Sequence, residues 1–347
     1  MGSWIHYCSS VAVLLLILLL HGANGCDYFK GSWVFDPSYP LYNSSSCSFI
    51  EKEFNCQNNG RPDSLYLKYR WKPSDCDLPR FDGLDFLRRN RGKRIMFVGD
   101  SLSLNQWKSL ICLLHSAVPH AKFTIVNQPE NHLTIFTFQD YGVSVMLSRN
   151  VYLVDLVSEK IGRVLKLDSV KETSKGWNNL DVLIFNTWHW WNRRGPTQPF
   201  DYFEVGNKIY KDMDRLAAFQ IALNTWATWV DTNIDPTKTR VFFQGISPSH
   251  YNGTDWNEPG LKNCQGQKIP LNGNTYPGGL PPALTVLKRV LSSMSKPVYL
   301  LDVTELSLLR KDGHPSSYGL AGMDCSHWCL PGVPDTWNQL LYNALIH

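Results

Sequence analysis

Apolar and polar positions follow two periodicities along the chain, and together they predict a layered α/β fold. Short apolar runs with β-branched residues predict strands at 94–99, 122–126, 133–138, 143–148, 182–186, 240–244 and 297–302. Apolar residues that recur every three or four positions predict helices at 103–115, 208–232 and 282–295. Because strands and helices alternate, we expect a mainly parallel sheet with helices on both faces.

The N-terminal part of the chain departs from this pattern. An uninterrupted apolar run before Ala23-Asn24-Gly25 predicts that residues 1–25 are a signal peptide cleaved before Cys26. An uncleaved signal-anchor is the alternative, although the run is shorter than the roughly 20 residues that span a bilayer. Residues 26–79 are rich in cysteine, aromatic residues, Pro and Asn, and they predict a disulfide-tied N-terminal lobe with little regular structure. Residues 80–347 carry the α/β pattern.

Composition limits the compartment and the partners. Of nine cysteines, one precedes the predicted cleavage site. The remaining eight predict four disulfides formed in the secretory pathway, with a pairing that the residues alone leave open. Two sequons, at Asn43 and Asn252, lie in turn-rich segments and predict N-linked glycans. The net charge of +4 is too small to indicate a nucleic-acid partner, although it is compatible with an acidic polysaccharide.

The strongest candidate for chemistry lies where the strand at 94–99 meets the helix at 103–115. The turn between them reads Gly99-Asp100-Ser101. Ser101 therefore lies at the carboxyl end of the sheet, where the backbone N–H groups of the following helix also point. An α/β enzyme places a nucleophile at this position. The alternative is a serine that only caps the helix.

A serine nucleophile needs a base and an acid that orients the base, and both are available near the C-terminus. Asp324 and His327 are three residues apart, so one turn can bring the carboxylate to the imidazole Nδ1 and leave Nε2 for Ser101. Cys325 and Cys329 flank the histidine, and disulfides at these positions would hold the loop rigid. These residues predict a Ser–Asp–His triad.

Three other interpretations of this segment remain open at the level of sequence. The clustered cysteines and histidine are compatible with a zinc site, although an oxidising compartment disfavours it. His314, which follows Asp312, is an alternative base. His327 is also compatible with a structural histidine that caps a turn.

The strand at 182–186 ends in Asn186-Thr187-Trp188-His189-Trp190-Trp191, at the same edge of the predicted sheet as Ser101. The backbone N–H of Ser101 and the side-chain amide of Asn186 are candidate oxyanion donors. Trp188 and Trp190 could form an aromatic platform against which sugar faces stack. A turn asparagine beside core tryptophans is the alternative.

Other motifs are weak. The Gly-x-Ser-x-Gly turn of α/β-hydrolases is absent because Ser103 occupies its last position. Asp212-Met213-Asp214 resembles the metal-binding Asp-x-Asp of glycosyltransferases, but it falls inside the predicted helix at 208–232, so we expect no metal site. The basic run at 88–94 indicates a solvated loop, with a patch for an acidic polymer as the alternative.

Taken together, the motifs resemble those of the GDSL/SGNH superfamily and, more closely, the plant trichome birefringence-like family. The shared stretches read CDYFKGSWV, FVGDSLSLNQ, NTWHWW, SPSH and DCSHWCLPGVPDTW, at 26–34, 97–106, 186–191, 247–250 and 324–337. The resemblance implies a flavodoxin-like SGNH core of three α/β/α layers with an N-terminal lobe. It also implies that Ser101 carries the acetyl group, His327 transfers the proton and Asp324 orients His327.

The resemblance implies a Golgi O-acetyltransferase that modifies xylan, mannan, xyloglucan or pectin. The acetyl donor, acetyl-CoA or another acetylated carrier, would be a co-substrate, and no bound cofactor is expected. A secreted polysaccharide acetylesterase with the same triad and a non-catalytic pectin-binding wall protein are the alternatives. Many family members have a longer N-terminal anchor and stem, so apoplastic secretion stays open beside a Golgi location. Gln244-Gly245-Ile246 stands where many members have an arginine, which leaves the acceptor open.

The family also implies a disulfide pairing by the order and spacing of the cysteines. The pairs would be Cys26–Cys76, Cys47–Cys112, Cys56–Cys329 and Cys264–Cys325.

Overall fold

The computed structural model describes residues 26–320 and 322–346, so the predicted leader at 1–25 lies outside the described residues. A seven-stranded sheet forms the centre, in the spatial order β13-β12-β9-β3-β6-β5-β4. The strands are β3 (Arg94–Gly99), β4 (Phe123–Gln128), β5 (Leu133–Phe138), β6 (Val143–Arg149), β9 (Val182–Phe185), β12 (Arg240–Gln244) and β13 (Tyr299–Leu301).

Five of the seven strands are parallel, and β5 and β4 add an antiparallel edge beyond β6. Counted along the chain, the parallel strands follow the order 2-1-3-4-5, which is one of the two common orders of doubly wound sheets. Such sheets bind ligands at the carboxyl ends of their strands, where the order reverses between β3 and β9. Ser101 directly follows β3 and Asn186 directly follows β9.

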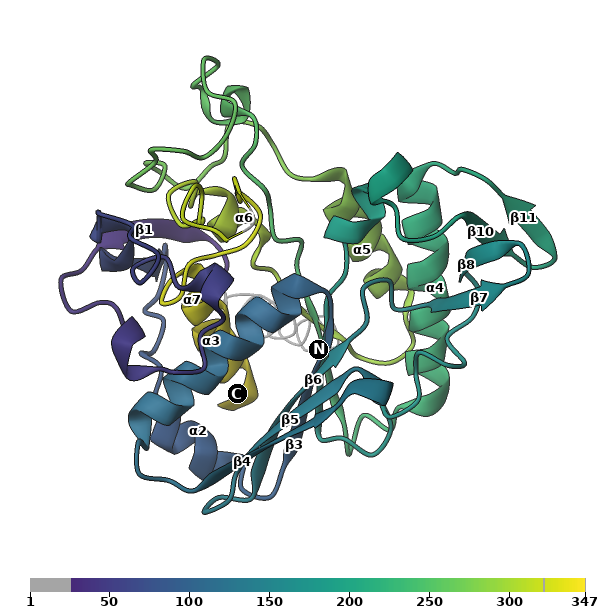
Figure 1. The fold of residues 1–347 in the computed structure, drawn as a ribbon. Coiled ribbons are helices and arrows are strands. Elements are labelled where there is room, and N and C mark those ends of the chain that lie inside the picture. The colour runs from purple at the N-terminus through teal and green to yellow at the C-terminus, as the bar shows by residue number, and fades with distance from the viewer. Residues whose placement is uncertain (1–25, 321, 347) are drawn as a thin grey trace, which may run out of the picture.

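Helices cover both faces of the sheet (Figure 1). In β3, Ile95 and Phe97 pack with the helices of one face, whereas Met96 and Val98 pack with those of the other. The first face carries α2 (Gly83–Arg89), α3 (Ser101–Ala117) and α7 (Val333–Ile346), and the second carries α4 (Arg215–Asn233) and α5 (Pro282–Ser293). The fold is therefore a mixed α/β fold with a parallel-rich central sheet, as the alternating pattern predicts.

The N-terminal lobe is mostly irregular, with one antiparallel pair of strands, β1 (Gly31–Phe35) and β2 (Tyr69–Pro73). Its short 3-10 helices are η1 (Ser44–Ser46), η2 (Lys52–Phe54) and η3 (Leu65–Lys68). The indole of Trp33 donates a hydrogen bond of 2.7 Å to the carbonyl of Leu306, in α6 (Thr304–Leu308), and so anchors the lobe to the core.

A second, four-stranded sheet lies beside α4 and was not anticipated (Figure 1). Its strands are β7 (Asp155–Glu159), β8 (Gly162–Lys166), β10 (Tyr202–Val205) and β11 (Lys208–Tyr210). The remaining 3-10 helices are η4 (Pro129–Asn131), η5 (His189–Asn192), η6 (Gly195–Thr197) and η7 (Gly253–Trp256).

The second sheet corrects the helix predicted at 208–232, whose first residues pair with β10 as β11. The helix begins only at Arg215, because the carboxylate of Asp214 accepts the backbone N–H of Ala217 and caps it. Among residues 26–320 and 322–346, no helix is both long and apolar enough to cross a bilayer.

Candidate active site

The turn between β3 and α3 fixes the position of Ser101. The Asp100 carboxylate accepts the backbone N–H of Leu102 at 2.9 Å and caps α3, so Ser101 is the first residue of the helix. A Cβ at Gly99 would lie 2.3 Å from the carbonyl oxygen of Asn186 and 2.4 Å from the Ser103 hydroxyl. Only glycine allows β3 and the segment after β9 to approach so closely, and this approach brings Ser101 to the crevice between them.

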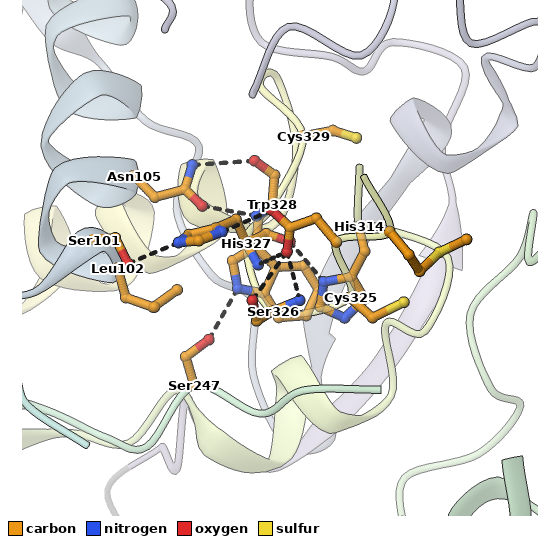
Figure 2. Close-up of polar contacts among 12 residues, drawn as sticks. Ser101, Leu102, Asn105, Ser247, His314, Cys325, Ser326, His327, Trp328 and Cys329 are labelled. Carbon is orange, nitrogen blue, oxygen red and sulfur yellow. Dashed lines mark hydrogen bonds and ion pairs between the residues drawn. The ribbon is translucent and has the colours of Figure 1, made fainter. Parts of the chain in front are cut away.

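Ser101, His327 and Asp324 form a continuous chain of hydrogen bonds (Figure 2). The hydroxyl of Ser101 lies 2.7 Å from His327 Nε2, and His327 Nδ1 lies 2.7 Å from Asp324 Oδ2. A carboxylate can only accept, so Nδ1 carries the proton and Nε2 is free to accept the proton of the Ser101 hydroxyl. The structure thus brings together the three residues that the sequence motifs singled out, across 226 positions of the chain.

The loop that carries His327 is folded by Asp324 itself. Asp324 Oδ1 accepts the backbone N–H groups of Ser326 and His327, at 2.9 and 3.0 Å, and the hydroxyl of Ser326 at 2.9 Å. In a turn of this kind the aspartate side chain accepts hydrogen bonds from backbone N–H groups two and three residues further along the chain. Three residues are enough to encode such a local structure. It leaves the second carboxylate oxygen for the imidazole.

The electrostatics of Asp324 and His327 suit a histidine that acts as a general base. Burial disfavours the charged form of Asp324, but the hydrogen bonds from the His327 ring and from the two backbone N–H groups outweigh it and hold the pKa of the carboxyl well below its usual range. Burial also disfavours protonated His327, yet the hydrogen bond and charge of Asp324 raise the pKa of the imidazole above its ordinary value. Asp324 is therefore ionised when His327 takes up a proton.

The loop is held on both sides by covalent and polar contacts. Its cysteines form the Cys264–Cys325 and Cys56–Cys329 disulfides, and the Cys26–Cys76 and Cys47–Cys112 pairs complete the pairing that the resemblance implies. Trp328 donates its indole N–H to the Ser247 hydroxyl at 2.9 Å, and its backbone N–H and carbonyl both bond the side chain of Asn105, at 2.8 and 3.1 Å. In Figure 2 Asn105 and Ser247 lie on opposite sides of Trp328. Four disulfides indicate folding in the secretory pathway.

The structure disfavours the alternatives to His327 as the base. Cys325 and Cys329 are bound in disulfides and are not thiolate ligands for zinc. His314 is buried, stacks on Trp328 with ring centroids 4.1 Å apart, and bonds to the backbone carbonyl of His327 rather than to Ser101.

A cleft of about 460 Å³ opens in front of Ser101 and His327. Trp188 and Trp190, which the sequence analysis proposed as a sugar platform, line it together with Tyr251 and Tyr276 of the long segment between β12 and α5. The cleft also holds residues that the sequence analysis left without a role, chiefly Arg193. Its guanidinium lies 3.6 Å from the centroid of the Trp190 ring.

Arg193 has no carboxylate partner among the ion pairs of residues 26–320 and 322–346, whereas its neighbour Arg194 pairs with Asp212 at 3.1 Å. The guanidinium is therefore an uncompensated positive charge in an aromatic cleft. Its position next to the NTWHWW motif was the only sequence signal for it.

Asn186 lies beside the cleft rather than in its lining. Its amide donates to Asp100 Oδ1 at 2.7 Å, which ties β9 to the cap of α3. One amide hydrogen remains, so a role as an oxyanion donor stays a prediction. The backbone N–H of Ser101 makes no hydrogen bond within the described residues and remains the first candidate donor.

The other motifs considered in the sequence lie outside the cleft. Asp212-Met213-Asp214 precedes α4 rather than lying inside it, because Asp214 caps the helix and Asp212 pairs with Arg194 and Arg215. The described residues contain no group of three side chains able to hold a metal ion. The basic run at 88–94 ends at the first residue of β3 and so lies at the opposite end of that strand from Ser101.

The two sequon asparagines, Asn43 and Asn252, are both exposed, as glycosylation requires. Whether they carry glycans stays a prediction.

Comparison with known proteins places the site in a family. Residues 78–344 match the family model described as PC-Esterase, the GDSL/SGNH-like acyl-esterase family found in Pmr5 and Cas1p, and residues 24–77 match the PMR5 N-terminal domain. The first match indicates acyl-transfer or esterase activity.

Three relatives from Arabidopsis thaliana match over nearly the whole chain. Protein trichome birefringence-like 41 is 62% identical over 97% of this chain and 95% of the relative. Protein trichome birefringence-like 38 is 58% identical over 93% of this chain and 84% of the relative, and protein trichome birefringence-like 43 is 53% identical over 97% of each. The chain therefore belongs to the trichome birefringence-like family and combines a PMR5 N-terminal domain with a PC-esterase domain.

Proposed function

We propose that this protein is a polysaccharide O-acetyltransferase that carries the acetyl group on Ser101. The observation that carries the proposal is the chain of two 2.7 Å hydrogen bonds from Ser101 through His327 to Asp324, at the base of an aromatic cleft. A flavodoxin-like SGNH core fits the strand order of the sheet and supports this function.

In the first half-reaction, Ser101 Oγ attacks the acetyl carbonyl of the donor while His327 Nε2 takes the hydroxyl proton. The negative charge that develops on the carbonyl oxygen faces the N-terminus of α3, where the Ser101 N–H can donate to it. His327 then gives its proton to the leaving group, and an acetyl ester on Ser101 remains. Asp324 stays ionised and stabilises the transient imidazolium.

In the second half-reaction, an acceptor hydroxyl takes the place of the leaving group. His327 removes its proton as the oxygen attacks the Ser101 ester, and the proton returns to Ser101 Oγ when the acetyl group departs. Trp188, Trp190 and Tyr251 line the cleft and offer aromatic surface against which a sugar ring can pack next to the ester, with one face of Trp190 covered by Arg193. The acceptor is a cell-wall polysaccharide in this proposal, and the donor is acetyl-CoA or another acetylated carrier.

Water competes with the sugar, and this makes an acetylesterase the second candidate. The side chain of His327 is 23% exposed, so water reaches the same position as an acceptor hydroxyl. Transfer then depends on how well an acceptor in the cleft displaces that water. The proposed location is the Golgi lumen or membrane, with the apoplast as the alternative for an esterase.

The test incubates the purified protein with an acetyl donor, with or without xylan, mannan, xyloglucan and pectin oligosaccharides, and measures acetylated oligosaccharide and free acetate by mass spectrometry. Acceptor-dependent acetylation that disappears in Ser101→Ala supports the transferase. Free acetate alone, also dependent on Ser101, supports the esterase. Oligosaccharide binding without either product, unchanged in Ser101→Ala, would show a non-catalytic wall protein.

A further inference from the structure

Two buried histidines, His250 and His314, take no part in the proposed reaction. Their exposed fractions are 0% and 1%, and their rings are tilted against each other with centroids 4.9 Å apart. His250 ends the SPSH motif in the segment after β12, and His314 lies in the loop after α6. They come together directly behind Trp328 and the loop of His327; His314 is the member labelled in Figure 2.

The outer nitrogens of the two rings both face backbone carbonyls. His314 Nδ1 lies 2.6 Å from the carbonyl oxygen of His327, and His250 Nε2 lies 2.8 Å from that of Leu308. A carbonyl oxygen can only accept a hydrogen bond, so both contacts are hydrogen bonds only when both of these nitrogens carry protons. A neutral imidazole has one N–H, and the other nitrogen of each ring would then hold a lone pair.

The inner nitrogens are His314 Nε2 and His250 Nδ1, and they lie 2.7 Å apart. In two neutral rings these nitrogens would place lone pair against lone pair at hydrogen-bond distance, which is repulsive. One additional proton converts the contact into an N–H···N hydrogen bond. Burial opposes this additional proton, since it lowers the pKa of His250 to about 4 and that of His314 well below its usual range, whereas relief of the repulsion between the two lone pairs favours it.

The geometry assigns to His250 and His314 a single shared proton, and with it the role of positioning residues for His327. The positioning role rests on the proposed function, whereas the shared proton does not. The cation connects the segment after β12 to the backbone of the catalytic loop, because His314 holds the His327 carbonyl while Asp324 holds its ring.

The surroundings of the pair can hold one positive charge. The ring of His314 stacks on the face of Trp328, and two carbonyl oxygens end the chain of hydrogen bonds. The ionised carboxylate of Asp324 favours the charge. The charge of Lys311 disfavours a cation at His250, although the Lys311 ammonium pairs with Glu258. The other cations nearby are also paired, Arg61 with Asp63 and Arg310 with Asp312. Besides Trp328, the aromatic neighbours of His250 are Trp256 and Tyr276, and burial raises the pKa of Tyr276, which keeps it neutral.

A cation at this place acts on the catalytic base. It repels a proton on His327 and so opposes the rise in the imidazole pKa that Asp324 causes. Removal of the shared proton should therefore make His327 more basic and move the acid limb of catalysis to higher pH. A purely structural pair of histidines would change kcat or stability without moving that limb.

The direct test is NMR of the full chain labelled with ¹⁵N-histidine, read between pH 6 and 8. We expect two histidines whose outer nitrogens are both protonated and whose inner nitrogens share one strongly deshielded proton. Two inner nitrogens with the shifts of unprotonated imidazole would overturn the shared proton. The NMR experiment requires no turnover, so it tests the shared proton even if the wild-type protein transfers no acetyl group.

The kinetic test uses His250→Gln and His314→Asn, because each new amide can still donate to the carbonyl that the histidine bonded. We expect kcat to fall, the KM for acceptor to change less than about twofold, and the acid limb of kcat/KM to move up by about one pH unit. His120→Gln, at an exposed position in the loop after α3, is the control and should leave the profile unchanged. An unmoved acid limb in folded variants would overturn the positioning role.

Discussion

Asp324→Asn separates the catalytic role of Asp324 from its structural one. The carboxylate accepts four hydrogen bonds, three at Oδ1 from the loop and one at Oδ2 from His327 Nδ1. An asparagine can present its carbonyl oxygen to the first three, so the loop keeps its fold. Its NH₂ group then faces His327 Nδ1, which must become an acceptor. The proton moves to Nε2, where it faces Ser101 and blocks removal of the hydroxyl proton.

The size of the effect follows from these contacts. The wrong tautomer and the lost negative charge together should lower kcat by about 10³–10⁴, which corresponds to about 4–5.5 kcal/mol of transition-state stabilisation. The melting temperature should fall moderately, because three of the four hydrogen bonds survive but lose the negative charge that they stabilise in the wild type. Ser326→Ala is the matched control, since it removes one of the bonds to Oδ1 and leaves the tautomer intact. It should lower kcat by less than about tenfold.

The assay compares the initial rate of acetyl transfer with the thermal melt for the wild type and both variants. The reasoning is refuted if Asp324→Asn keeps its activity within about tenfold of the wild type. A large loss of stability in this variant would also contradict it, because the loop would then depend on the charge of Asp324.

Three further predictions concern pH, the cleft and the disulfides. His327 must be neutral to accept a proton and its pKa is raised, so kcat/KM should fall as pH drops through a value above about 6.5; a flat profile down to pH 5 would exclude it as the base. Arg193→Gln should raise the KM for uronic-acid oligosaccharides about tenfold, with neutral oligosaccharides and the Arg194→Gln control unaffected in steady-state assays. Serine substitutions that remove the Cys264–Cys325 disulfide should lower the unfolding free energy by about 4 kcal/mol in denaturant titrations and should also lower kcat. Serine substitutions that remove the Cys26–Cys76 disulfide, which has a similar sequence separation, should lower the unfolding free energy as much but preserve kcat.

The sequence predicts best those strands that are continuous apolar runs bounded by charged residues or glycine. The strand at 94–99 is a short apolar run between charged residues and a glycine, and it matches β3 residue for residue. By contrast α7 (Val333–Ile346) was not predicted, although Val333, Trp337, Leu340, Leu341 and Ala344 recur at the three- and four-residue spacing of a helix. The strands of the second sheet were also missed, because each includes charged residues and none is the continuous apolar run that marks the equally short β9.

The residues of the candidate site also differ in how readily the sequence reveals them. Asp324 and His327 are recognisable because their interaction is local, and Ser101 because it follows a strand. The bonds between Asn105 and Trp328 join residues 223 positions apart, and no local pattern encodes such a contact. The disulfide pairing likewise came from family resemblance alone, since eight cysteines allow 105 pairings.

The central claim is that Ser101 becomes acetylated during turnover, and one measurement tests it most directly. The protein is mixed with an acetyl donor, quenched in acid within the first turnover, digested and analysed by peptide mass spectrometry. We predict an acetyl ester on Ser101 in the wild type, its discharge when acceptor oligosaccharide is added, and its absence from Ser101→Ala and His327→Ala. An active protein that never carries acetyl on Ser101, or that acetylates its acceptor equally well as Ser101→Ala, would contradict the account.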